Sequence, residues 1–122
     1  MLTEVARRTI EGESFDLCLR DFLDEFLAAP NAEALATEPE LLAPKDGKQG
    51  RIQDAYLAAV AEHLAAEHKL PIPSWVTGDQ RQLHRPWFAT PMAALRTVLI
   101  RESPPAFRAR NLFVSANTLS RA

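Results

Sequence analysis

RIQDAYLAAVAEHLAAEHKL (residues 51–70) contains the longest helical pattern in this chain of 122 residues. Its stripe residues follow the i, i+3, i+4 spacing of one helix face: Ile52, Tyr56, Ala59, Val60, His63 and Leu64. The alanines between them allow other helices to approach closely, and Pro71 and Pro73 end the pattern. We therefore expect the longest helix of the protein to lie here.

The composition of the whole chain favours the same fold class. Alanine and leucine account for 36 residues, whereas valine and isoleucine, which favour strands, account for 9. The length suits one domain, and neither half has enough apolar periodicity for a core of its own. The prediction is an all-α fold, a single compact helical domain over residues 1–122 with about five to six helices.

Other helices are indicated by their start and stop residues. Ser14 suits the N-cap of a helix over 14–29, which places Cys18 in the core as an inert thiol. The remaining helices are expected over residues 2–11, over 31–36, after Thr90-Pro91, and after Ser103-Pro104, where the last one carries Phe107. In the helix after Thr90-Pro91, the spacing turns four apolar side chains inward: Met92, Leu95, Val98 and Leu99.

Three segments have turn-like or irregular patterns. Prolines and glycines predict an exposed connection over 44–50. Residues 70–90 are expected to form a long loop, because they contain no strong helix or strand pattern. Aromatic side chains should hold this loop against the core: Trp75, Trp87 and Phe88. The end of the chain, 112–119, fits either a short extended piece or the end of a helix.

No catalytic or metal-binding motif emerges from the residue spacing. His63 and Glu67 lie four residues apart and could reach one ion, but His68 points away and a zinc site needs three or four ligands. The sequence has neither a glycine-rich phosphate loop nor a nucleophile elbow. We expect no metal, no cofactor and no enzymatic activity.

The sequence also indicates a compartment. A single cysteine cannot form an internal disulfide, which favours a reducing environment. Charged residues interrupt the apolar ones near the start of the chain, and no apolar run approaches the roughly 20 residues that a membrane helix needs. We expect a cytoplasmic protein with no membrane partner.

The charges are unevenly placed along the chain, although the formal net charge is only −2. Residues 1–80 contain 7 basic and 15 acidic side chains, whereas residues 81–122 contain 7 arginines and one acid, Glu102. These arginines could pair with the acidic half, form a surface for an acidic protein, or bind nucleic acid. Arg108 and Arg110 diverge by about 200° on a helix, so one of them is expected to bind internal groups.

Four stretches of the chain resemble a group of small uncharacterised bacterial proteins: QDAYLAAVAEHLA (53–65), LPIPSWV (70–76), RPWFA (85–89) and ESPPAFRARNLFVSANTLSR (102–121). Members of this group are often encoded beside a nucleotidyltransferase-like protein, an arrangement typical of toxin–antitoxin pairs. The resemblance implies an antitoxin-like partner role and transfers no catalytic residue. The chain departs from common antitoxins because it has no clear helix-turn-helix and no disordered arm.

The charge asymmetry and the resemblance together predict a non-catalytic, antitoxin-like protein that neutralises a nucleotidyltransferase-like toxin through its basic, aromatic C-terminal surface. The expected partner surface is acidic, because guanidinium groups pair well with carboxylates. The alternative is a nucleic-acid-binding regulator, whose affinity would fall steeply with salt. The residues assigned to partner binding are Arg85, Trp87, Phe88, Arg101, Arg108, Arg110, Asn111, Asn117 and Arg121.

Overall fold

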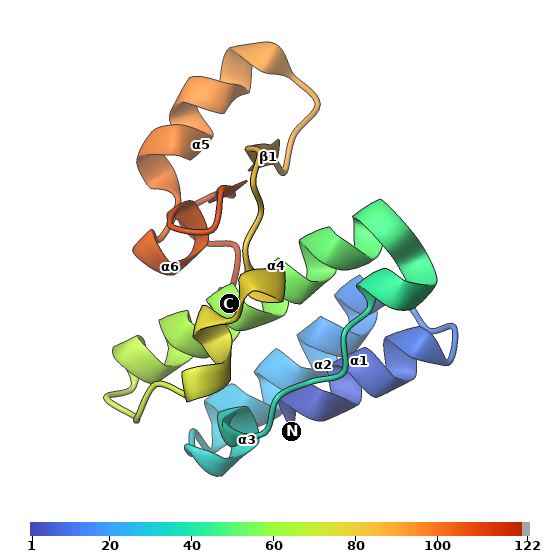
Figure 1. The fold of residues 1–122 in the computed structure, drawn as a ribbon. Helices are drawn as coiled ribbons and strands as arrows, with labels where there is room; N and C mark the ends of the chain where they lie inside the picture. The colour runs from blue at the N-terminus through green and yellow to red at the C-terminus, as the bar shows by residue number, and fades with distance from the viewer. Residues whose placement is uncertain (121–122) are drawn as a thin grey trace.

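The computed structural model describes residues 1–120, and it confirms the all-α prediction (Figure 1). Helices contain most of these residues, and the strands are two-residue pieces. In chain order the elements are α1 (Leu2–Ile10), α2 (Phe15–Ala28), α3 (Glu33–Ala36), α4 (Ala43–Glu67), the 3₁₀ helices η1 (Ser74–Thr77) and η2 (Asp79–Arg81), β1 (Trp87–Phe88), the 3₁₀ helix η3 (Ala93–Leu95), α5 (Arg96–Glu102), α6 (Pro105–Arg108) and β2 (Leu112–Phe113).

The long helix α4 lies at the centre of the fold. The pair α1 and α2 packs along one side of it, while η1, η2 and α6 pack along the other (Figure 1). Aromatic rings connect the two sides, because Tyr56 of α4 meets Phe15 of α2 at 6.1 Å and Phe107 of α6 at 5.0 Å between centroids. The prediction from residues 51–70 is therefore confirmed, and α4 is buried on more than one face.

The start of α4 corrects part of the prediction of an exposed connection over 44–50: residues 44–49 are exposed, as expected, but they are helical. These residues belong to the helical segment, and only Gly47 leaves helical geometry, with φ 56° and ψ −125°. Glycine adopts this positive φ without the clash that a Cβ would cause. Gly50 then allows the first turn to fold back, since a Cβ there would lie 2.4 Å from the Leu42 carbonyl oxygen. The glycines that suggested a loop form a tight kink within a helix.

The N-terminal pair of helices follows its local signals. The Ser14 hydroxyl accepts a hydrogen bond from the Leu17 N–H at 3.3 Å, which confirms the predicted N-cap. Gly12, at φ 108°, lies in the turn between α1 and α2. Cys18 is buried within α2, and burial raises the pKa of its thiol, as expected for an unreactive core cysteine.

The long segment between α4 and α5 is held at two points. Trp75 donates its indole N–H to the Leu35 carbonyl at 3.0 Å, so the predicted attachment of the loop by Trp75 is confirmed. Further along, β1 pairs in parallel with β2, with Trp87 opposite Leu112. Of the two alternatives for 112–119, a short extended piece or the end of a helix, the structure shows the extended one at residues 112 and 113.

The helix after Thr90-Pro91 begins later than the sequence predicted. The Thr90 hydroxyl accepts from the Met92 N–H at 3.2 Å, but a 3₁₀ turn follows and α5 begins only at Arg96. As Figure 1 shows, α5 and β1 project from the side of α4 that lies away from α1 and α2. This projecting segment is joined to the core mainly through β2 and α6.

The predicted inward face of this helix is wrong at three positions. Only Leu99 is buried, whereas Met92, Leu95 and Val98 are 60%, 42% and 44% exposed. Met92 precedes η3 and Leu95 belongs to η3, so neither lies on α5. The helix α5 itself contacts chiefly η3 and the two-residue strand β2, which are too small to cover its apolar side chains. The fold thus leaves an apolar helix surface uncovered within the described residues.

Candidate functional site

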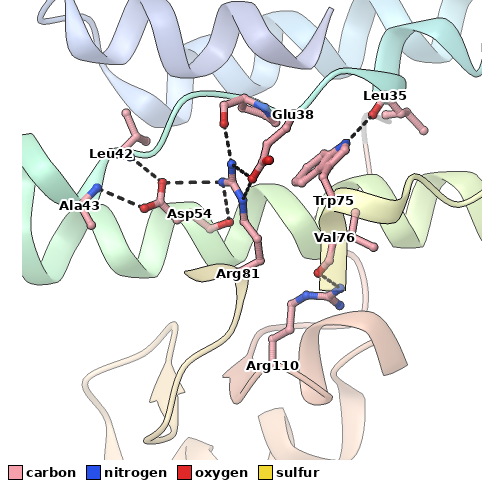
Figure 2. A network of polar contacts seen from close by, with 10 residues as sticks. Leu35, Glu38, Leu42, Ala43, Asp54, Trp75, Val76, Arg81 and Arg110 are labelled. Atoms are coloured by element: carbon pink, nitrogen blue, oxygen red, sulfur yellow. Dashed lines mark hydrogen bonds and ion pairs between the residues drawn. The ribbon is translucent and has the colours of Figure 1, made fainter. Parts of the chain in front are cut away.

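Arg81 is the clearest example of an internal arginine. Its side chain is fully buried, and its guanidinium donates to Glu38 at 3.0 Å, to the Pro39 carbonyl and to the Asp54 carbonyl at 3.3 Å (Figure 2). The guanidinium carbon also lies 5.0 Å from the centre of a Trp75 ring. Arg81 therefore joins η2, α4 and the segment before α4, and it is not available to a partner.

Asp54 completes this internal network. Its buried carboxylate accepts hydrogen bonds from the Leu42 N–H at 2.7 Å and the Ala43 N–H at 3.1 Å, and lies 3.8 Å from Arg81. Burial raises the pKa of this carboxyl, while the two backbone N–H groups and Arg81 act in the opposite direction. The carboxylate satisfies backbone donors at the start of α4, which is a structural role.

Arg110 does not lie on the surface to which the sequence assigned it. Its side chain is buried and donates to the Ala106 carbonyl at 2.8 Å, the Val76 carbonyl at 2.9 Å and Glu62 at 2.9 Å. Figure 2 shows its bond to Val76 beside the Trp75 contact. Arg108, by contrast, is exposed. The expectation that one of these two arginines binds internal groups is confirmed.

Asn111 holds the segment between η2 and β1 in place. Its side-chain amide donates to the Leu83 carbonyl at 2.8 Å, and its own carbonyl accepts from the Trp87 N–H at 2.8 Å. Its φ of 63° turns the chain sharply between α6 and β2. Asn111 therefore positions residues 83–87, and its amide N–H₂ already has an internal partner.

The other assigned residues lie on or near the surface. Phe88 is half-buried and stacks on Phe113 with ring centroids 5.0 Å apart, and the Arg96 guanidinium carbon lies 5.1 Å from the Phe88 centroid. Asn117 is exposed and accepts from the Ser115 hydroxyl at 2.6 Å. The remaining assignments are Arg85 and Arg101, which are exposed, Trp87, which is half-buried, and Arg121, which lies outside the described residues.

The first surface feature is the α5 lobe, defined here as residues 85–102. Val98, Leu99 and Ile100 are consecutive in α5, so they spread over about 200° of its circumference. Only Leu99 is covered, and Val98 and Ile100 are each 44% exposed. Apolar side chains therefore reach solvent on both flanks of this helix, beside exposed arginines.

The second feature is an open cavity of about 500 Å³ between α4 and the segment that leads to β1. The sequence indicated Arg85 and Trp87 from its wall, whereas Lys48 and Arg51 were missed because both belong to the acidic half of the chain. The three-residue spacing of Lys45, Lys48 and Arg51 was the available signal. A cavity with several cations and an indole can bind an anion that carries an aromatic group.

Other types of site have little support in residues 1–120. Their histidine, cysteine, aspartate and glutamate side chains form no group of three that could hold a metal ion. None of the helices in that part of the chain is long and apolar enough to cross a membrane.

No protein-family model, curated protein or solved structure matches this chain.

Proposed function

We propose that this chain is a non-catalytic, antitoxin-like protein of the cytoplasm that binds an acidic protein partner through the α5 lobe. The partner that the sequence resemblance suggests is a nucleotidyltransferase-like toxin encoded beside it. The active sites of such enzymes hold carboxylates that bind metal ions, so a part of each site is acidic. A basic and apolar helix could occupy a groove of this kind.

The observation that carries the proposal is the uncovered apolar surface of the α5 lobe. Met92, Leu95, Val98 and Ile100 are all more than two-fifths exposed. Single exposed apolar side chains are common, but four within nine residues of one projecting segment are typical of a protein interface. A partner groove that covers them would supply the burial that the rest of the fold does not.

The charge of the lobe indicates what surrounds that groove. Between Asp79 and Glu102 the chain contains no acidic residue, whereas the lobe contains Arg85, Arg96 and Arg101. None of these three arginines forms an ion pair with the described acidic residues. The complementary partner surface is therefore an apolar groove bordered by carboxylates.

The test is co-purification of the tagged chain with the neighbouring nucleotidyltransferase-like protein, followed by a growth assay for rescue from toxicity. Two substitutions together, Val98→Asp and Arg101→Glu, should abolish the complex and the rescue. Both positions are exposed, so the variant should retain the circular dichroism spectrum of the wild type.

Arg20→Glu provides a matched control, because Arg20 is an exposed arginine on α2, distant from the lobe. It should leave binding and rescue unchanged. Equal capture of the partner by the Val98→Asp, Arg101→Glu variant would show that the lobe is not the interface. Self-association of the purified chain through the lobe, without a partner, would overturn the proposal of a different protein as its occupant.

A further inference from the structure

The open cavity beside α4 combines cations and an indole from two segments, and it shares only residues 85–87 with the α5 lobe. It lies between the first turns of α4 after the Gly47 kink and the extended segment that leads to β1. Its polar and aromatic lining comes from both segments: Lys48, Arg51, His84, Arg85 and Trp87. Three permanent cations thus border one space, and no acid lines it.

The cations at this cavity have no ion-pair partner among the described residues, and only Arg51 is near enough to the buried Asp54 carboxylate to lower its pKa. Lys48, Arg51 and Arg85 are exposed, and none forms an ion pair or hydrogen bond among the described residues, unlike Arg81 and Arg110. Lys48 and Arg51 lie three residues apart on α4, whereas Arg85 lies 34 residues beyond Arg51 in the chain, so the fold brings the two walls together. Their grouping favours an anion with several oxygens, because guanidinium and ammonium groups bind phosphate strongly.

The apolar part of the lining fits an aromatic group. Ile52 and Leu83 form part of the wall, and Leu83 and Trp87 pack against the core, so their positions are fixed. Asn111 fixes this wall further by accepting from the Trp87 N–H and donating to the Leu83 carbonyl. An indole held in place beside cations provides a stacking surface for a nucleobase.

From these features we propose that the cavity binds a nucleoside phosphate. Lys48, Arg51 and Arg85 hold the phosphate oxygens, and the base lies against Trp87. A volume of about 500 Å³ is within the range that small-molecule ligands occupy. This inference does not rest on the proposed partner role: the cavity shares residues 85–87 with the α5 lobe, but Lys48 and Arg51 lie on α4, outside the lobe, and the exposed apolar side chains of the lobe lie outside the cavity.

Isothermal titration calorimetry with ADP, adenosine and inorganic phosphate tests the cavity. ADP should bind with a measurable affinity, and adenosine and phosphate should each bind about tenfold or more weakly than ADP, because each makes only part of the contacts. Lys48→Gln with Arg51→Gln should weaken ADP binding about tenfold or more. Arg20→Gln, on an exposed part of α2, is the matched control and should leave the affinity unchanged.

Two further sets of substitutions separate the second wall of the cavity from α5. Arg85→Gln should weaken ADP binding from the other wall, and Arg96→Gln with Arg101→Gln on α5 should not. Absence of ADP binding to the wild type would overturn the proposal. Equal ADP affinity of the Lys48→Gln, Arg51→Gln variant would also overturn it. Binding of a ten-nucleotide single-stranded DNA without any binding of ADP would show that the basic wall serves a polynucleotide and not a nucleoside phosphate.

Discussion

Arg81 and Arg85 are four residues apart, yet the first is fully buried and the second is exposed. The difference comes from what each side chain meets. Arg81 enters the interior and finds Glu38, the Pro39 carbonyl and Asp54. A buried charge requires such compensation, since desolvation alone would strongly disfavour it.

Replacement of Arg81 by Met should therefore be strongly destabilising. Removing one partner of a buried ion pair leaves Asp54 without its compensating charge, which costs about 3–5 kcal/mol of unfolding free energy at neutral pH. The same substitution at Arg85 should change the unfolding free energy by about 0.5 kcal/mol or less. Urea denaturation of the two variants and the wild type measures both values. Similar losses for both variants would contradict the structural role of Arg81.

The loss in the Arg81→Met variant should also depend on pH. Burial raises the pKa of Asp54 and Arg81 lowers it, so the variant should have a higher Asp54 pKa than the wild type. A carboxyl with a raised folded-state pKa contributes stability that is fully present below its unfolded pKa, 3.8, and is lost as pH rises through the folded pKa. The variant should therefore lose less unfolding free energy, relative to the wild type, at about pH 4 than at about pH 7.

At the level of single residues, the sequence indicated some roles and not others. Ser14 and Cys18 were predicted correctly, because capping and burial within one helix depend on neighbours in the chain. Burial of Arg81 depends on Glu38, which lies 43 residues away, and no local pattern encodes that contact. The divergence of Arg108 and Arg110 showed that one would be internal, but not which one.

Among the elements, the kink of α4 illustrates how the same residue type supports two local structures. Glycine at 47 and 50 suggests a loop, but here one glycine supplies a positive φ and the other allows close backbone approach. The distinction depends on the first turn packing back against the long helix. Periodicity alone predicted the helix from residue 51 and could not include the turn before it.

The Gly50→Ala substitution should reveal this close approach. A Cβ at residue 50 would lie 2.4 Å from the Leu42 oxygen and 2.6 Å from the Ala43 nitrogen, so the backbone must move. We expect a loss of about 2 kcal/mol in unfolding free energy, although alanine ordinarily stabilises a helix relative to glycine. Thermal unfolding followed by circular dichroism measures the change.

Gly78→Ala is the control for this change. Gly78 has φ −62° and ψ 150°, and a Cβ there would have its nearest neighbours at 3.5 Å, which is ordinary contact. The unfolding free energy of the Gly78→Ala variant should stay within about 0.5 kcal/mol of the wild-type value or rise slightly above it. A stabilising Gly50→Ala substitution would show that the turn does not pack on the helix as described.

For the molecule as a whole, the uneven charge has two outcomes. Arg81 and Arg110 pair with Glu38 and Glu62 of the acidic half, so part of the basic end is neutralised within the fold. Other arginines remain exposed on the α5 lobe. The sequence predicted the asymmetry and the helical class, but the division between internal and exposed arginines depends on contacts between distant segments. The exposure of the apolar side chains of the α5 lobe likewise could not be predicted, because it depends on which elements pack around the lobe.

The contrast between the buried helix α4 and the largely uncovered helix α5 should be visible in native-state hydrogen exchange. Amides of α5 should exchange fastest among the longer helices, because only Leu99 is buried there and local opening exposes little apolar surface. Amides in the buried part of α4 should exchange slowest, since their opening requires disruption of the core. The short helix α6 is the internal control: Phe107 is fully buried, so α6 should exchange more slowly than α5 despite having fewer residues.

If α5 were as protected as α6 in the isolated chain, its apolar side chains would already be covered, and the argument for a partner on the α5 lobe would fail. Addition of the partner should slow exchange in α5 and leave the rates in α1 unchanged.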